Sequence, residues 1–311
     1  RPARPGNIRV VSSNLLNFFK GDGRGGGFPT ERGANSPAEF DAQSGRLAAA
    51  FSAISPDLLA VQELENDGFG PHSAAASLVT LLDNNGMGHY EVIAPHDGPI
   101  GTDVITVGLF YRQETLEPLG SAHVLDIPEF DGLSRQPLAQ LFRDRRSGER
   151  FLVAANHLKS KGSCPEGGEN ANQKDGQGCW STARVAAARA LVEWLGALAH
   201  QVDTPHILIL GDMNALRMED PIRIFTEANF IELVEHQSGL PQYSYVFYGN
   251  AGTLDYAFAS PELAARTSDA QIWHINADWP RNMALPRPWL RMSDHDPVIV
   301  DFDFSQAATS D

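Results

Sequence analysis

The sequence has little cysteine, few basic residues and no long apolar run, and each shortage excludes a class of protein. Its 311 residues include only 2 cysteines, too few for a disulfide-rich scaffold or for a structural zinc site made of thiolates. A membrane-spanning helix needs roughly 20 apolar residues. The most apolar stretch, residues 185–199, is interrupted by Arg189 and Glu193. We therefore expect neither a membrane segment nor a membrane partner.

Basic residues are outnumbered by acidic ones. The 24 Lys and Arg stand against 39 Asp and Glu, so the formal net charge is −15. Proteins that coat nucleic acid or anionic membranes need a broad basic face, which this composition excludes. The composition does not exclude an enzyme that binds a cation of its own. With 42% hydrophobic residues the chain can bury one large core, which excludes a disordered protein.

The chain organisation indicates a single domain. No linker-like tract divides residues 1–311, and we expect residues 1–6 and 305–311 to be flexible ends. The chain begins with neither an initiator Met nor a signal segment, so we expect a processed or partial product.

Short apolar runs rich in β-branched residues alternate with helical patterns. Strands are predicted at residues 8–11, 58–61, 104–111, 151–155, 206–210, 254–259 and 298–304. Helices are predicted at 44–54, at 73–82 and from Ser181 onward, where Ser181 or Thr182 is the expected N-cap. This alternation favours an α/β or α+β fold over a helical bundle or an all-strand sandwich.

The two cysteines, Cys164 and Cys179, bound the polar, glycine-rich stretch CPEGGENANQKDGQGC. Buried free thiols normally lie in apolar runs, so a disulfide is favoured here over two unrelated thiols. Closing this loop would contribute roughly 3 kcal/mol through the unfolded state and would imply an oxidising compartment.

Polar side chains gather where the apolar runs end. The runs IRVVSSN, DLLAVQE, FLVAANH and HILILGDMN each finish in amide, carboxylate or imidazole groups, and further acids and a histidine occur in TLDYAF and SDHDP. In α/β sheets, ligands bind where strands end and loops converge. Oxygen donors with two histidines and no cysteine suit Mg²⁺, Mn²⁺ or Ca²⁺. This pattern predicts a metal-assisted hydrolytic site, with an acidic surface cluster as the alternative.

The ordered series Asn14, Gln62-Glu63, Asn156-His157, GDMN at 211–214, LDY at 254–256 and SDHDP at 293–297 resembles the endonuclease/exonuclease/phosphatase superfamily, which includes pancreatic-type deoxyribonucleases. The segments ELENDG, NHLKSKGS and DGQGCW further resemble the secreted bacterial nucleases of this superfamily. The resemblance implies a four-layered sandwich of two packed mixed β-sheets flanked by α-helices. It covers nearly the whole chain.

The resemblance also implies roles for individual residues. Glu63 would be the main metal ligand, with Asn14 and Asp294 beside it. The ion would be Mg²⁺, with Mn²⁺ or Ca²⁺ as alternatives.

The remaining residues would act on the phosphodiester. Asp212 and Asn214 would hold the attacking water and the phosphate, and Asp255 would orient His295. His157 would be a second imidazole on the phosphate. Asn156, Lys159 and Lys161 are expected phosphate contacts, with solvated lysines as the alternative.

Three positions depart from, or are not explained by, the resemblance. Glu65 stands where pancreatic enzymes have Arg, which puts one minor-groove contact in doubt. The carboxylate expected to support His157 is not obvious, and Asp103 is a weak candidate. Asp296 follows His295 with no clear consequence.

The negative charge is unevenly distributed along the chain. Residues 57–131 carry 1 basic and 13 acidic side chains, a net of −12, whereas residues 143–161 carry 6 and 2, a net of +4. Residues 281–291 carry 3 basic side chains and no acid. These two stretches are candidate contacts for a phosphate backbone, with a plain surface loop as the alternative for 281–291.

We therefore predict a secreted, monomeric, divalent-metal-dependent nuclease that cleaves DNA, and RNA as a further substrate, with little sequence specificity. The first alternative is another phosphoesterase of the same fold, such as a sphingomyelinase-like enzyme or a nucleotide phosphatase. The second is a catalytically inactive nucleic-acid-binding module.

Overall fold

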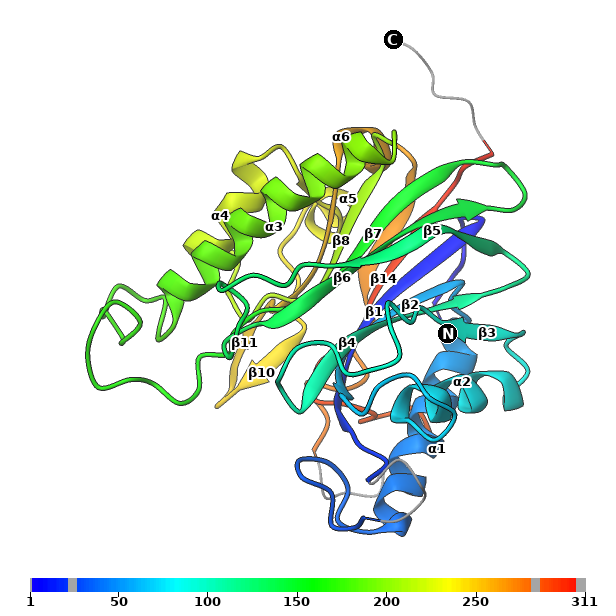
Figure 1. Ribbon diagram of the computed structural model, residues 1–311, viewed down its shortest axis with the longest axis horizontal. Helices are drawn as coiled ribbons and strands as arrows, with labels where there is room; N and C mark the ends of the chain where they lie inside the picture. Colours follow the sequence, from blue (N-terminus) through cyan, green and yellow to red (C-terminus); the bar gives the residue numbers. More distant parts are fainter. Residues whose placement is uncertain (1, 22–26, 281–285, 306–311) are drawn as a thin grey trace.

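The computed structural model describes residues 2–21, 27–280 and 286–305. Two six-stranded mixed sheets pack face to face, and helices cover their outer faces (Figure 1). The predicted four-layered α/β sandwich is confirmed. The predicted flexible ends fall partly outside the described residues, because residue 1 and residues 306–311 are not among them.

The first sheet has the strand order β13-β14-β1-β2-β4-β3. Its strands are β13 (Thr267–Ile272), β14 (Val298–Phe302), β1 (Ile8–Phe18), β2 (Leu58–Glu65), β4 (Ile105–Arg112) and β3 (Tyr90–Val92). Helices α1 (Pro37–Ile54) and α2 (Ala74–Asn84) cover its outer face. Ser36 and Ser73 are the N-caps of α1 and α2, and each side chain accepts a hydrogen bond from the first turn.

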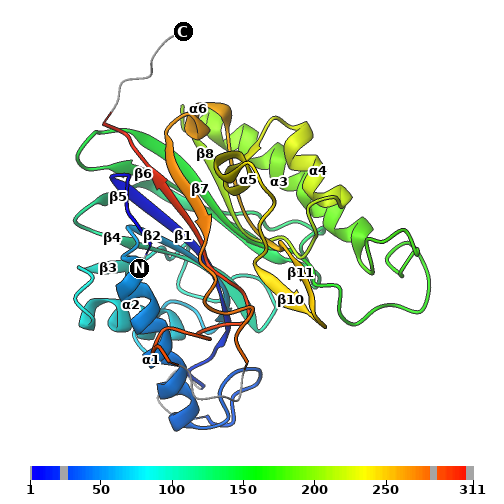
Figure 2. The ribbon, with the colours of Figure 1, turned by 180° about the vertical axis from the view of Figure 1, so that it is seen from behind.

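The second sheet has the order β5-β6-β7-β8-β12-β9. Its strands are β5 (Leu116–Val124), β6 (Arg135–Asp144), β7 (Arg150–His157), β8 (Ile207–Asp212), β12 (Asp255–Ala259) and β9 (Ile231–Glu232). Helices α3 (Ser181–Gln201) and α4 (Asp220–Glu227) cover its outer face, and α5 (Leu233–Ser238) and α6 (Pro261–Ala264) are short. A separate ribbon of β10 (Tyr245–Phe247) and β11 (Asn250–Gly252) projects from the sandwich (Figure 2).

The main core lies between the two sheets. Inward-facing aliphatic and aromatic side chains such as Val10, Val107, Phe151 and Val300 are almost completely buried there. The central strands are covered on both faces, by the other sheet and by helices, so they consist of nearly continuous apolar residues. This explains why the central strands could be found from short apolar runs.

Each sheet contains one parallel pair at its centre. β1 pairs with β2, and β7 pairs with β8, while the other ladders are antiparallel. Parallel strands end at the same edge of a sheet. Asn14, Glu63, His157 and Asp212, which lie at or near the ends of these four strands, are therefore brought to one edge of the sandwich.

The loop before α3 is closed by a disulfide between Cys164 and Cys179, whose Cα atoms are 5.4 Å apart, so the predicted pairing is confirmed. The predicted N-cap of the following helix is wrong. Trp180 occupies the cap position in a left-handed conformation without a side-chain cap bond. Instead, Asn170 of the disulfide loop accepts a hydrogen bond from the backbone N–H of Ala183 at 3.0 Å. Tertiary contact thus replaces the local cap.

Within the described part of the chain, none of the helices combines the length and apolar character that crossing a membrane requires.

Candidate active site

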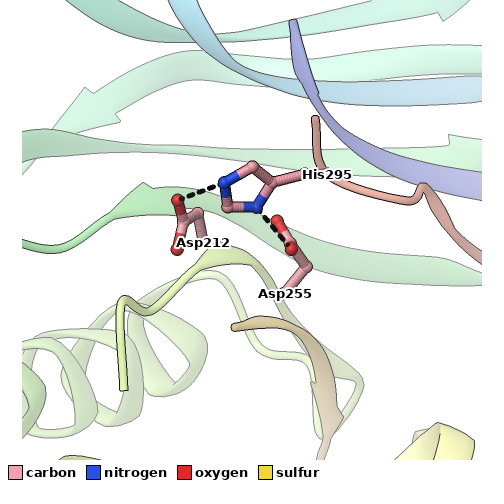
Figure 3. Close-up of side chains that lie close together, drawn as sticks. All are labelled: Asp212, Asp255 and His295. Atoms are coloured by element: carbon pink, nitrogen blue, oxygen red, sulfur yellow. Dashed lines mark hydrogen bonds and ion pairs between the residues drawn. The ribbon is translucent and has the colours of Figure 1, made fainter. Parts of the chain in front are cut away.

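Two aspartates and a histidine from three chain segments meet at the centre of the site. Asp212 ends β8, Asp255 begins β12 and His295 precedes β14 (Figure 3). One potential ligand atom from each lies within 4.8 Å of the others, and all three residues are buried. The antiparallel register pairs Asp255 with Asp212 across neighbouring strands, which brings the two carboxylates together. Buried carboxylates in such proximity are expected only with cationic partners.

His295 is held in one orientation by Asp255. Its Nδ1 lies 2.8 Å from Asp255 Oδ2, and the same oxygen accepts a hydrogen bond from Ser244 Oγ at 2.6 Å. The Ser244 hydroxyl oxygen in turn accepts from the backbone N–H groups of Leu254 and Asp255. This network leaves His295 Nε2 facing Asp212 Oδ2 at 3.9 Å.

The pKa values of His295 and Asp212 are both shifted by their surroundings. Burial alone would lower the pKa of His295, but the charges of Asp255 and Asp212 raise it well above the ordinary value of 6.5. Burial raises the pKa of Asp212 to about 7, and the charge of Asp255 adds to the effect. His295 is therefore a proton donor near neutral pH, and Asp212 is a carboxylate basic enough to accept a proton.

Asn14 and Glu63 form a second pair beside this group. Asn14 Nδ2 donates to Glu63 Oε1 at 3.1 Å and approaches Asp212 Oδ2 at 3.4 Å. The backbone N–H of Asn17 donates to Glu63 Oε2 at 2.9 Å. Glu63 has a φ of 59°, and both strands carry register shifts here. Such unfavourable backbone geometry is typical of functional sites, where it re-aims a side chain.

The turn after β8 depends on Gly211. Its φ is +142°, and a Cβ at this position would lie 2.0 Å from the carbonyl oxygen of Asn156 on β7. Only glycine permits this close approach. The turn then places Asn214 with a φ of 49°, and its backbone N–H donates to Asp212 Oδ1 at 2.9 Å. Asn214 Nδ2 is bound to the carbonyl of Leu158 at 3.1 Å.

His157 lies on the other side of Asp212, with its Nε2 3.5 Å from Asp212 Oδ2. Burial, together with the nearby charge of Arg135, lowers the pKa of His157 well below 6.5, so this imidazole is neutral and the contact is not an ion pair. Asp103 is not its supporting carboxylate. That carboxylate is 3.2 Å from Arg135 Nε and 3.5 Å from Arg32 Nη1. Among the described residues, His157 Nδ1 has no hydrogen-bond partner.

Arg135 is a site residue that sequence reasoning missed. It begins β6, and the ladder places it opposite His157 on β7. The side chain is buried, and its Nη1 has no hydrogen-bond partner in the described part of the chain. The charges of Glu63 and Asp212 act on it. A buried guanidinium with an unused donor is suited to binding an anion. Had strand β6 been predicted, Arg135 would have been a candidate, because it lies at the start of that strand opposite His157.

The three residues predicted to contact phosphate have their side chains in contact with other groups of the protein in this structure. Asn156 Nδ2 donates to the carbonyls of Ala154 and Leu210, although its buried Oδ1 has no partner among the described residues. The Nζ of Lys159 lies 5.0 Å from the ring centre of Trp180. The Nζ of Lys161 is paired with Glu219. Contact between these three side chains and phosphate therefore stays a prediction.

Asp296 and Glu65, which the resemblance does not explain, accept hydrogen bonds from the backbone of loops around the site. Asp296 Oδ1 accepts the backbone N–H groups of residues 275–277, and Asp296 Oδ2 is 3.0 Å from His274 Nδ1. Glu65 Oε2 accepts the N–H groups of residues 20 and 21. The charge of Asp294 helps to raise the pKa of the neighbouring His295. Asp296 and Glu65 therefore have positional explanations.

The donors at this site fit a divalent cation. Asp255 Oδ1 is buried without a hydrogen-bond partner among the described residues, and the pKa of Asp212 is raised by burial and by neighbouring carboxylates. A cation would relieve both costs. The donor set of carboxylates, an amide and imidazole is that of a hard or borderline divalent ion and includes no thiolate. The Asp212–Asp255–His295 group and the Asn14–Glu63 pair are its two adjoining candidate positions.

The comparisons with known proteins agree with this geometry. The model of the Endonuclease/Exonuclease/phosphatase family matches residues 11–295. No curated protein sequence gives a significant match.

Solved structures share the fold at low sequence identity. The catalytic domain of human nocturnin, with bound sulfate, has a TM-score of 0.62 and 18% identity, covering 97% of this chain and 96% of that chain. A mannosyl-6-phosphatase of Bacteroides thetaiotaomicron has a TM-score of 0.64 and 17% identity, covering 95% and 99%. ANGEL2, described as a 2′,3′-cyclic phosphatase, has a TM-score of 0.60 and 14% identity, covering 94% of each.

Proposed function

Because the chain belongs to the Endonuclease/Exonuclease/phosphatase family, whose model spans residues 11–295, we propose that it is a divalent-metal-dependent nuclease that hydrolyses phosphodiester bonds of DNA. The observation that carries the proposal is the buried group of Asp212, Asp255 and His295, with one atom of each within 4.8 Å of the others. It joins a proton donor to a proton acceptor of raised pKa. RNA is a further candidate substrate.

The chain's own residues divide the reaction between them. Asp212 accepts a proton from the attacking water, and the Asn214 backbone N–H keeps that carboxylate in place at 2.9 Å. Protonated His295, fixed by Asp255 at 2.8 Å, donates from Nε2 to the departing oxygen. Two separate groups are needed because attack and departure occur on opposite sides of an in-line phosphorus.

The phosphate itself is held by cations and neutral donors. Arg135 supplies a guanidinium whose Nη1 is unused in the described structure, and neutral His157 supplies an uncharged imidazole beside Asp212. Glu63, with Asn14 beside it, would hold the divalent ion, because Asp212, Asp255 and His295 are occupied with proton transfer. When bound, that ion would stabilise the charge that develops on the phosphate oxygens.

We also propose that the protein works outside the cytosol. The Cys164–Cys179 disulfide supports this, because disulfides persist in oxidising compartments.

A phosphatase that acts on small phosphate esters is the second candidate function, favoured by the fold shared with a sugar phosphatase and a cyclic phosphatase. Supercoiled circular DNA separates the candidates. We expect the purified protein to nick the circle in Mg²⁺ or Mn²⁺ and to lose this activity in EDTA. Release of inorganic phosphate from mononucleotides or sugar phosphates, with intact circular and linear DNA, would refute the nuclease proposal. Degradation of linear DNA alone would identify an exonuclease.

A further inference from the structure

An apolar groove opens directly beside the candidate active site. It has a volume of about 540 Å³ and lies between the β10–β11 ribbon and the loop of residues 160–162. This volume falls in the roughly 300–1,000 Å³ range of small-molecule sites. Asn214, whose N–H holds Asp212, contributes to the lining, as does Leu254, the neighbour of Asp255. A group in the groove would therefore lie next to the reacting phosphate.

A row of aromatic rings leads from the catalytic histidine into this groove. The ring of Tyr245 lies 4.5 Å from that of His295, and Phe247 follows, stacked at 6.4 Å from Tyr245 with an interplanar angle of 18°. Alternate residues of a strand share one face, which explains why these two rings lie side by side. Both rings line the groove.

The groove is apolar and yet open to solvent. Phe247 is 60% exposed and Leu216 is 41% exposed, so that two large apolar side chains of the groove are accessible to a ligand. Gly252 allows Leu216 to pack closely against the β10–β11 ribbon, because a Cβ at this position would lie 2.5 Å from the end of Leu216. Lys161 forms the polar rim. A flat apolar ring with a polar edge and an attached anion fits these features.

We propose that this groove binds one nucleobase of the substrate strand, next to the scissile phosphate and unstacked from its neighbours, with Phe247 as the stacking platform. This inference rests on the proposed nuclease function. A base within a continuous duplex is already stacked on both faces, so it must be extruded before it can enter. An unpaired strand avoids that cost. The enzyme therefore prefers single-stranded or frayed DNA to intact duplex.

The test pairs a change in the protein with a change in the substrate. The variant is Phe247→Ala, and the control is Leu240→Ala, which removes a 65% exposed apolar side chain that does not line the groove. The substrate is a single-stranded oligonucleotide with one ordinary phosphodiester and methylphosphonates elsewhere. Two further substrates carry an abasic residue on the 5′ or the 3′ side of that linkage.

We expect one of the abasic substrates to lower kcat/KM of the wild type and of Leu240→Ala by roughly tenfold, a typical effect of losing one stacked base. Phe247→Ala should lose roughly tenfold on the complete substrate and little more on the abasic one, because both changes remove the same contact. Annealing a complementary strand should slow the wild type more than Phe247→Ala.

The possible results distinguish a failure of the base-binding groove from a failure of the proposed nuclease function. The base-binding groove is refuted, while the nuclease stands, if the wild type cleaves the oligonucleotide but the loss from Phe247→Ala and the loss from the abasic residue multiply. It is also refuted if Phe247→Ala cleaves every substrate as the wild type does. If the wild type cleaves no oligonucleotide in Mg²⁺ or Mn²⁺, the nuclease and the groove assignment both fall.

Discussion

Replacing Asp255 by Asn tests the proton-donor assignment while hardly changing the size of the side chain. Asp255 Oδ2 accepts from His295 Nδ1 at 2.8 Å and from Ser244 Oγ at 2.6 Å, and Oδ1 has no partner among the described residues. If the amide oxygen of Asn keeps both bonds, its NH₂ becomes a buried donor without an acceptor. If the amide turns over, the NH₂ faces two donors. Both arrangements disfavour the protonated imidazole.

The expected loss is large because the pair is buried. Two unit charges 2.8 Å apart attract by roughly 6 kcal/mol at an effective dielectric constant of about 20, before the cost of desolvation. Removing the anion therefore lowers the pKa of His295, since burial of the ring then acts with less opposition. Less of the donor is protonated, and the remaining donor is poorly oriented. We expect kcat to fall by about 10²- to 10⁴-fold, the range for a general acid.

Two measurements check this prediction. Cleavage of a defined oligonucleotide gives kcat, and NMR titration of the His295 ring in the metal-free protein gives the direction of its pKa change. Ser244→Ala is the control, because it removes a hydrogen bond to the same oxygen and keeps the charge; its loss should stay below about tenfold. An unchanged His295 titration in Asp255→Asn, or a kcat within threefold of wild type, would refute the reasoning.

Three further changes probe the metal, the turn and the core. Glu63→Gln should lower kcat by roughly 10²-fold or more with an unchanged circular dichroism spectrum, because the ion supplies several kcal/mol of charge stabilisation; wild-type turnover would contradict the ligand assignment. Gly211→Ala should cost about 2 kcal/mol or more in urea unfolding, since φ is +142° and the new Cβ would lie 2.0 Å from the Asn156 oxygen; unaltered stability would show that the turn can relax. Arg9→Met should cost about 3–5 kcal/mol in the same assay, because it leaves Asp301 buried without its 2.6 Å partner; a loss below 1 kcal/mol would mean that water reaches the site.

The interior strands of the two sheets were predictable from the sequence except for β6, whereas the edge strands were not. β8 reads as the apolar run before Asp212 because helices and the second sheet cover both its faces. β6 contains Gln140, which is buried but hydrogen-bonded to backbone carbonyls of Leu119 and Leu141. Hydropathy alone treats such a residue as exposed. Strand β6 was missed for this reason, and Arg135 at its start was missed with it.

The candidate site could be predicted as a set of residue types but not as a geometry. Strand ends and family resemblance pointed to Asp212, Asp255 and His295, which the fold brings together. The same reasoning pointed to Lys159 and Lys161, whose side chains contact Trp180 and Glu219 in this structure, so that their contact with phosphate stays a prediction. The direction of a side chain depends on contacts with residues from distant segments of the chain, and residue spacing along the sequence does not identify these residues.

The distribution of charge bears on how an acidic protein would act on the polyanion proposed as its substrate. Four of the six basic side chains in the stretch 143–161 are paired with acids: Arg143 and Arg145 with Glu117, Arg150 with Asp203, and Lys161 with Glu219. Of the other basic stretch, residues 281–285 lie outside the described structure.

Within the described part of the chain, we expect the attraction for phosphate to be strongest at the reacting position. There, the acids that would repel an anion are also the groups suited to holding a divalent ion, and a bound ion reverses the local sign of the potential. Arg135 adds the buried cation. Such a site gains affinity for phosphate only when the ion is in place. The net charge of −15 then limits adhesion to nucleic acid away from the site without opposing hydrolysis within it.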